Sequence, residues 1–241
     1  MRYKKYTRDA PHAYTFGVFP TLELLAHQPG RVVEVLLHSS GVRNAGVAKI
    51  RALCEAATIP LTHDDKLIER LEAREDTYAI GVFRKYETAL DPAVNHLVLV
   101  NPSDMGNLGT ILRTLLGFGR RDLALIKPAA DIFDPRAVRA SMGALFQVNT
   151  TYYDSFETYR NQFPQHHLHP FMTDGACSLP DAVFTSPYAL IFGSESSGLP
   201  ANFHNVGTTI SIPQSAAVDS LNLAVAVAVS VYEAERGRVS H

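Results

Sequence analysis

The stretch that decides the fold runs from residue 96 to residue 116 and reads HLVLVNPSDMGNLGTILRTLL. Its first five residues, His96–Val100, are dominated by Leu and Val, which is typical of a short buried strand. A polar loop with two glycines follows, and apolar residues at helical spacing then predict a helix from about Leu108 to Leu116. A strand that leads through such a loop into a helix is the repeating unit of α/β folds with a mostly parallel sheet.

The same alternation continues to the end of the chain. Further apolar strands are predicted at Leu123–Ile126, Leu168–Met172, Ala189–Phe192 and Thr209–Ile212. A long helix is expected from about Ser220 to Glu235, with Ser220 as a suitable N-cap and Gly237 as a suitable stop.

The residues before this sheet show the alternation on a smaller scale. Strands are expected at Val32–Leu37, around Pro60 and at Thr77–Phe83, and helices at Asn44–Ala57 and from Asp64 or Asp65 to Leu71. The segment Lys85–Asn95 is polar, contains Pro92 and lacks periodicity, as is typical of a linker. We therefore expect two domains, a small α/β domain over residues 1–90 and a larger one over residues 94–241.

The composition is that of a globular protein, with 46% hydrophobic and 19% charged residues. No apolar run approaches the about 18–20 residues that a membrane span needs. The two cysteines, Cys54 and Cys177, exclude a disulfide framework and fit a cytoplasmic protein with reduced thiols. The net charge of −2 does not by itself indicate a nucleic-acid binder, although four basic residues lie within the first eight positions.

Several common cofactor and metal sites are not predicted. There is no GxxxxGK[ST] phosphate loop and no GxGxxG after a strand, which makes a metabolic α/β enzyme with a nucleotide cofactor improbable. The histidines His166, His167 and His169 are interpreted as a polar entry to a strand, because ligands so close in sequence rarely give tetrahedral geometry. No metal is expected.

Ligands of open parallel sheets bind at the carboxyl ends of the strands, where three loops lie at residues 101–114, 192–199 and 212–222. In the first loop, Arg113 follows Asn107 by nearly two helical turns, and we expect both side chains on one side. Arg113 then either binds a phosphate or pairs with Asp104.

The other two loops also carry polar residues with two interpretations each. Glu195, between Gly193 and Gly198, is either an orienting acceptor or a helix cap. Asn222 is a poor interior helix residue, so it either presents its amide to a substrate or satisfies a backbone group.

Together, in this order, the three loops resemble the TrmH (SpoU) family of the SPOUT superfamily. The motifs that carry the resemblance are residues 107–114 (NLGTILRT), 192–199 (FGSESSGL), and 212–213 (IP) with 220–222 (SLN) and 232–233 (YE). Residues 139–144 (RASMGA) and 171–175 (FMTDG) are also similar to the family. The resemblance covers residues 95–241 well, and residues 14–90 more loosely resemble the small substrate-binding domain that precedes many members.

The resemblance implies a fold, a reaction and an assembly. The sheet would be closed by a C-terminal trefoil knot, an exception to the general absence of knots. The protein would methylate a ribose 2′-hydroxyl of RNA with S-adenosylmethionine and act as a homodimer whose active site is completed across the interface. We expect rRNA as the substrate; the alternatives are a tRNA 2′-O-methyltransferase and a non-catalytic RNA-binding module of the same fold.

The resemblance also implies site residues. The catalytic residues would be Asn107, Arg113, Glu195, Ser220 and Asn222, and the cofactor would be held near Thr173, Gly193, Ser194, Gly198, Ile212, Gln214 and Leu221. Arg113 would bind a phosphate and stabilise the developing alkoxide rather than act as a base, because a guanidinium stays protonated with a pKa above about 12. Glu195 and Asn222 would orient Arg113 and the ribose, and Ser220 would fix the third loop. Residues 101–106 are longer, and Gln214 more polar, than is usual in the family.

Overall fold

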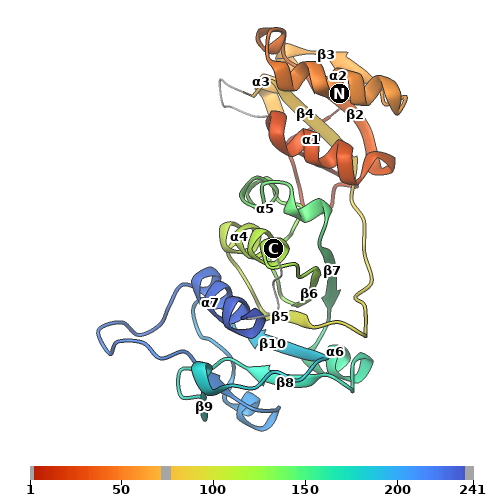
Figure 1. Cartoon of the computed structure of the whole chain (residues 1–241). Helices are drawn as coiled ribbons and strands as arrows, with labels where there is room; N and C mark the ends of the chain where they lie inside the picture. Colours follow the sequence, from red (N-terminus) through yellow and green to blue (C-terminus); the bar gives the residue numbers. More distant parts are fainter. Residues whose placement is uncertain (1–2, 72–76, 237–241) are drawn as a thin grey trace. The chain divides into compact units, whose positions relative to one another are not determined.

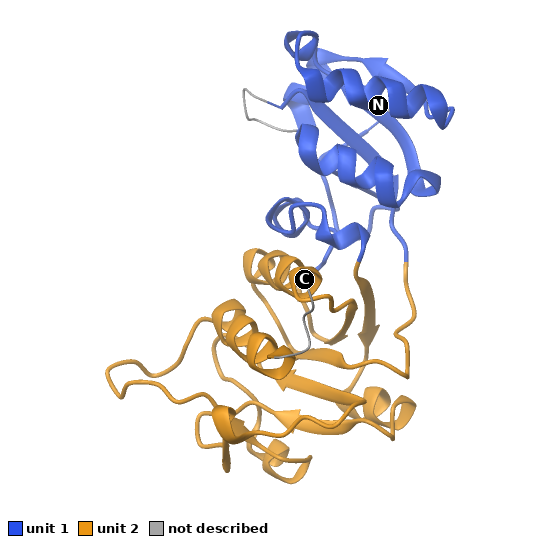
Figure 2. Cartoon of the chain, in the orientation of Figure 1, with its two compact units in different colours: residues 1–86, 131–147 blue, residues 87–130, 148–241 orange. Residues whose placement is uncertain are grey.

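The computed structural model describes residues 3–71 and 77–236, so the expected helix stop at Gly237 lies outside the described residues (Figure 1). The chain forms two compact units (Figure 2). The first contains residues 1–86 and 131–147, and the second contains residues 87–130 and 148–241. No helix among the described residues is long and apolar enough to cross a membrane.

The second unit is built on a five-stranded sheet in which every neighbouring pair of strands is parallel. In sheet order the strands are β7 (Asn149–Tyr153), β6 (Asp122–Ile126), β5 (His96–Val100), β10 (Tyr188–Phe192) and β8 (His167–Pro170). The predicted α/β fold with a mostly parallel sheet is confirmed. Strand β7 was not predicted, because its polar sequence NTTYY lacks the apolar signal of the other strands.

Both faces of this sheet are covered by helices. On one face, Val98 and Ile191 pack in a buried cluster with Phe156 and Tyr159 of α6 (Phe156–Gln162). The opposite face meets α4 (Met105–Gly117) and α7 (Leu223–Glu235), which also contact each other. Burial on both sides explains why the central strands are continuously apolar.

The first unit contains a four-stranded sheet in the order β1 (His12–Tyr14), β4 (Ala79–Arg84), β2 (Val32–Leu37) and β3 (Leu61–His63). Strand β4 runs antiparallel to β1 and β2, and β3 is parallel to β2. Its helices are α1 (Val18–His27), α2 (Ala45–Ala56) and α3 (Asp65–Leu71). The predicted strand β2 and helices α2 and α3 are confirmed, and Asn44 caps α2 by accepting a hydrogen bond from the Gly46 N–H at 2.8 Å.

Residues 131–147, which the sequence places inside the larger domain, belong to the first unit. They form α5 (Pro135–Ala140), which packs against β1, and a short 3₁₀ turn, which packs against α1. Gly143 has a φ of +86°, and a Cβ there would lie 2.4 Å from Cγ of Glu23. The Gln28 side-chain amide donates to the Phe146 carbonyl at 3.0 Å. The domain expected over residues 94–241 therefore differs from the second unit, which does not include residues 131–147.

The cluster of histidines at the start of β8 is involved in packing. The His166 ring lies 4.3 Å from the His96 ring, and its Nε2 donates to the Val94 carbonyl at 2.9 Å. Burial lowers the pKa of His166 and of His169, and it lowers the pKa of His96 to about 4, so these rings are neutral at pH 7. Among the described residues, no three His, Cys, Asp or Glu side chains are grouped to hold a metal.

Candidate active site

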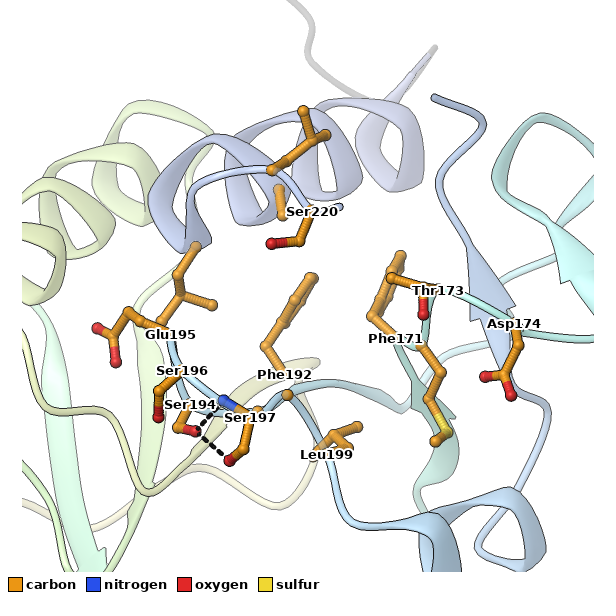
Figure 3. Close-up of a pocket in the computed structure, with 16 residues that line it drawn as sticks. Phe171, Thr173, Asp174, Phe192, Ser194, Glu195, Ser196, Ser197, Leu199 and Ser220 are labelled. Atoms are coloured by element: carbon orange, nitrogen blue, oxygen red, sulfur yellow. Dashed lines mark hydrogen bonds between the residues drawn. The ribbon is translucent and has the colours of Figure 1, made fainter. Parts of the chain in front are cut away.

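The loops that follow β8 and β10 and the segment before α7 enclose a cavity of about 320 Å³ (Figure 3). Phe171 and Phe192 line it with stacked rings whose centroids are 4.4 Å apart. A second cavity of about 100 Å³ shares these two rings and extends to Ile212 and Gln214. The cavity thus lies where ligands of parallel sheets bind, at the carboxyl ends of the strands.

The loop after β10 is folded tightly on itself. Gly198 has a φ of +65°, and its N–H donates to the Ser194 carbonyl at 3.0 Å. A Cβ on Gly193 would lie 2.0 Å from the Gly198 carbonyl carbon, so only glycine permits this close approach. The hydroxyl groups of Ser194 and Ser197 are 2.8 Å apart and close the turn. The loop thereby presents backbone groups to the cavity.

The structure brings together all seven residues that were expected near a cofactor. They line one or both cavities: Thr173, Gly193, Ser194, Gly198 and Leu221 the larger, and Thr173, Ile212, Gln214 and Leu221 the smaller. Their contact with a cofactor stays a prediction, but their positions are those of one continuous binding surface.

Three of the expected catalytic residues form a hydrogen-bonded relay. Asn222 caps α7, because its Oδ1 accepts from the Ala224 N–H at 2.9 Å. Its Nδ2 therefore donates to Oδ1 of Asn107 at 3.1 Å, and Nδ2 of Asn107 donates to Glu195 at 3.3 Å. Each amide has only one orientation that satisfies these bonds, so the relay fixes the direction in which Asn107 points.

The Glu195 carboxylate holds the loop after β5 and is not a helix cap. Its Oε2 accepts from both the N–H and the hydroxyl of Ser103, at 3.1 and 3.0 Å, and its Oε1 accepts from the Asp104 N–H at 3.2 Å and from Asn107. Burial raises the Glu195 pKa, but the hydrogen bonds outweigh it and keep the pKa below its ordinary value. Ser103 was missed by the sequence analysis, because a serine in a loop carries no pattern of its own.

Arg113 does not face the relay. Six residues at about 100° per residue place it about 120° around α4 from Asn107, so the expectation that both side chains share one side is wrong. Arg113 is exposed and makes no hydrogen bond or ion pair with the described residues. It does not pair with Asp104, which instead caps α4 by accepting from the Asn107 N–H at 2.6 Å.

Ser220 lines the cavity but does not begin the last helix (Figure 3). Helix α7 begins at Leu223 with Asn222 as its N-cap, so the expected N-cap at Ser220 is wrong. Serine and asparagine are both good N-cap residues, and the backbone geometry makes Asn222 the N-cap of α7. The shift leaves Ser220 available to the cavity.

Residues 95–232, more than half of the chain, match the SpoU rRNA Methylase family. The chain belongs to this family. The resemblance seen in the three loops is therefore confirmed, and the SpoU region contains every residue of the relay and both cavities.

Individual SpoU relatives support the assignment at the level of sequence and fold. The 23S rRNA (uridine(2479)-2′-O)-methyltransferase of Streptomyces viridochromogenes is 33% identical over 147 residues, which cover 58% of this chain and 51% of that protein. The matched region spans about half the length of the first curated relatives.

Two solved structures extend the comparison. The SpoU methyltransferase AviRb from Streptomyces viridochromogenes in complex with the cofactor AdoMet has a TM-score of 0.82 at 25% identity, covering 98% of this chain and 95% of that one. A structure on the 2-OH methylation of C/U34 on tRNA is 36% identical with a TM-score of 0.57, and it covers 61% of this chain and 97% of that one.

Proposed function

We propose that this protein transfers a methyl group from S-adenosylmethionine to a ribose 2′-hydroxyl of RNA in the cytoplasm. The observation that carries the proposal is the relay of Glu195, Asn107 and Asn222 beside a cavity at the strand ends of a SpoU fold.

The cavity fits the proposed cofactor. Its apolar walls, which include Phe171, Phe192 and Leu223, suit a planar adenine, and the serines and backbone of residues 193–198 supply polar partners. The larger cavity alone has about the volume that small-molecule sites occupy, roughly 300 Å³ or more. When bound there, the cofactor supplies an already activated methyl group, so the protein mainly has to position the acceptor.

The residues of the relay and Arg113 then have definite roles. A ribose 2′-hydroxyl is a poor acid and must lose its proton as it attacks the methyl group, and in this proposal the neighbouring phosphate of the RNA accepts that proton. Arg113 binds the neighbouring phosphate and stabilises the negative charge that develops on the 2′-oxygen. Glu195 and Asn222 orient Asn107 through their hydrogen bonds to it, whereas the family resemblance implied that they orient Arg113 and the ribose. Asn107 retains one N–H beyond its bond to Glu195, and this donor is directed at the ribose.

Ser103 should contribute to turnover by holding Glu195. We expect Ser103→Ala to lower kcat about tenfold, because a hydrogen bond to a charged group is worth about 1.5–3 kcal/mol and the backbone N–H compensates in part. The Kd for S-adenosylmethionine should not change, since Ser103 does not line the larger cavity. Ser103→Thr, which keeps the hydroxyl, is the matched control. Equal turnover numbers in the alanine variant and the unmodified protein would rule this role out.

The active protein is proposed to be a homodimer. Val225, Val229 and Tyr232 lie on one face of α7 and are 48%, 41% and 57% exposed. Such an apolar stripe is typical of an interface, and a second copy of the chain would cover it. Because Arg113 lies about 120° around α4 from Asn107, we propose that Arg113 of one copy acts at the relay of the other copy. Sedimentation equilibrium that yields the mass of one chain at micromolar concentration would contradict the dimer.

The finer topology is also proposed to include the C-terminal trefoil knot. Ile210 pairs in parallel with Phe171 after β8, and β11 (Ile210–Ser211) pairs with β9 (Cys177–Ser178). The chain then returns to α4, where Asn222 meets Asn107. This return of the chain to earlier loops is the observation that supports the proposal. A crystal structure in which the C-terminal segment does not pass through a loop formed by the preceding chain would exclude the knot.

We infer that rRNA is the substrate and that the first unit binds it. The AviRb likeness extends over 98% of this chain, whereas the structure concerned with tRNA covers 61%. The likeness to AviRb therefore includes the first unit. The relative named as a 23S rRNA 2′-O-methyltransferase comes from the same organism as AviRb.

The proposal is tested with S-adenosylmethionine labelled in its methyl group and pools of rRNA and tRNA that lack their own modifications. We expect label in rRNA that resists alkaline cleavage at the modified ribose. Label in tRNA alone would show that the substrate is tRNA and not rRNA. Cofactor binding without label in either pool would favour the non-catalytic alternative.

A further inference from the structure

The walls of the larger cavity carry negative charge only. Among the described residues that line it, the charged side chains are Asp174 and Glu195, and there is no Lys or Arg. The smaller cavity is lined by uncharged side chains. A site with this charge favours a cationic ligand over a neutral one of the same shape, because the Coulomb term differs while the packing does not.

One of the two carboxylates is already engaged. Both oxygens of Glu195 accept hydrogen bonds from the loop after β5, with Ser103 on one oxygen and Asp104 and Asn107 on the other. The Glu195 charge contributes to the electrostatic potential in the cavity, but its oxygens already accept hydrogen bonds from the loop after β5. Asp174 is therefore the carboxylate that is available to contact a ligand directly.

Asp174 is held at the rim of the cavity by a rigid backbone (Figure 3). The Met172 N–H donates to the Ile210 carbonyl at 2.9 Å, and the Gly175 N–H donates to the Met172 carbonyl at 3.1 Å. A Cβ on Gly175 would lie 2.4 Å from the Ile210 carbonyl carbon, so the turn is packed directly against β11. The backbone of the turn that carries Asp174 is thus held in place beside the cavity.

His204 holds the Asp174 carboxylate from outside the cavity. Its Nε2 lies 3.3 Å from Oδ2 of Asp174, while Oδ1 has no hydrogen-bond partner among the described residues. The Asp174 side chain is 70% exposed, so its interaction with a ligand charge is partly screened and its effect is modest. A bound ligand that covers the rim would reduce that screening.

We propose that Asp174 selects the cationic methyl donor over the neutral product. The inference rests on the proposed function. S-Adenosylmethionine carries a sulfonium, whereas S-adenosylhomocysteine carries an uncharged thioether in the same place. A carboxylate at this rim therefore favours exchange of product for donor after each turnover.

The test is calorimetric titration of the full chain with each of these two compounds. Asp174→Asn should weaken binding of S-adenosylmethionine about threefold to fivefold, the range expected for a partly exposed charge pair. Binding of S-adenosylhomocysteine should change less than twofold. Asp181→Asn removes an exposed carboxylate outside both cavities and is the matched control, with no change expected for either compound.

The other outcomes are distinct. Equal weakening of both compounds would mean that Asp174 contacts a group common to them, and no weakening would mean that it contacts neither; each result overturns the selection. If the unmodified protein binds neither compound, the proposed function fails together with this inference. Binding by the unmodified protein with an unaltered preference in Asp174→Asn defeats this inference alone.

Discussion

Replacing Arg113 with alanine is expected to lower the rate of methyl transfer about 100-fold to 1,000-fold, the loss typical of removing one group that stabilises an oxyanion. The side chain is exposed and has no partner among the described residues, so the free energy of unfolding should change by less than about 0.5 kcal/mol. Binding of S-adenosylmethionine should be unchanged, because Arg113 lines neither cavity. The measurements are single-turnover transfer to RNA, cofactor titration and urea denaturation.

Two further variants separate charge from geometry. Arg113→Lys keeps the positive charge but loses the planar pair of donors that can bind a phosphate through two hydrogen bonds, so its rate should lie well below that of the unmodified protein. Arg160→Ala removes an exposed arginine of α6 in the same unit and should have no effect. A near-normal rate with an unchanged pH profile in Arg113→Lys would show that the bidentate role is wrong.

The sequence predicted the parts of this fold that depend on local pattern. The buried strands β5 and β10 and helix α2 each show a continuous or periodic apolar signal, and each is found within a residue or two of its expected bounds. Residues 131–147 could not be assigned to the first unit in this way, because their contacts with α1 join residues more than a hundred positions apart.

In the site, too, local sequence patterns identified the residues but not their contacts. The residue types that the three loops supply were identified from motifs, and the cavity unites those expected to hold the cofactor. Which residue orients which was not predictable. The helical phase separates Arg113 from Asn107, and the backbone geometry makes Asn222 rather than Ser220 the cap of α7. The separation of Arg113 from Asn107 follows from their spacing once α4 is known to be a regular helix that includes both residues, whereas the choice of Asn222 as the cap depends on backbone angles that spacing in sequence does not resolve.

Gly193→Ala is expected to have the second large effect, because it removes the close approach on which the cavity depends. The added Cβ would lie 2.0 Å from the Gly198 carbonyl carbon and 2.2 Å from the Leu199 nitrogen. Both neighbours are backbone atoms and cannot rotate away, so the loop over residues 193–199 must open. We expect the affinity for S-adenosylmethionine to fall more than tenfold and the free energy of unfolding to fall by about 1–3 kcal/mol.

Gly117→Ala is the matched control for that variant, since a Cβ there meets nothing within 4 Å. Gly117 ends α4, where alanine is the better helix former, so the free energy of unfolding should stay equal or rise by up to about 1 kcal/mol. Titration with S-adenosylmethionine and urea denaturation of both variants distinguish the two positions. If Gly193→Ala bound the compound as well as Gly117→Ala does, the contact between Gly193 and Gly198 could not be what shapes the site, and the assignment of this loop to the cofactor would have to be abandoned.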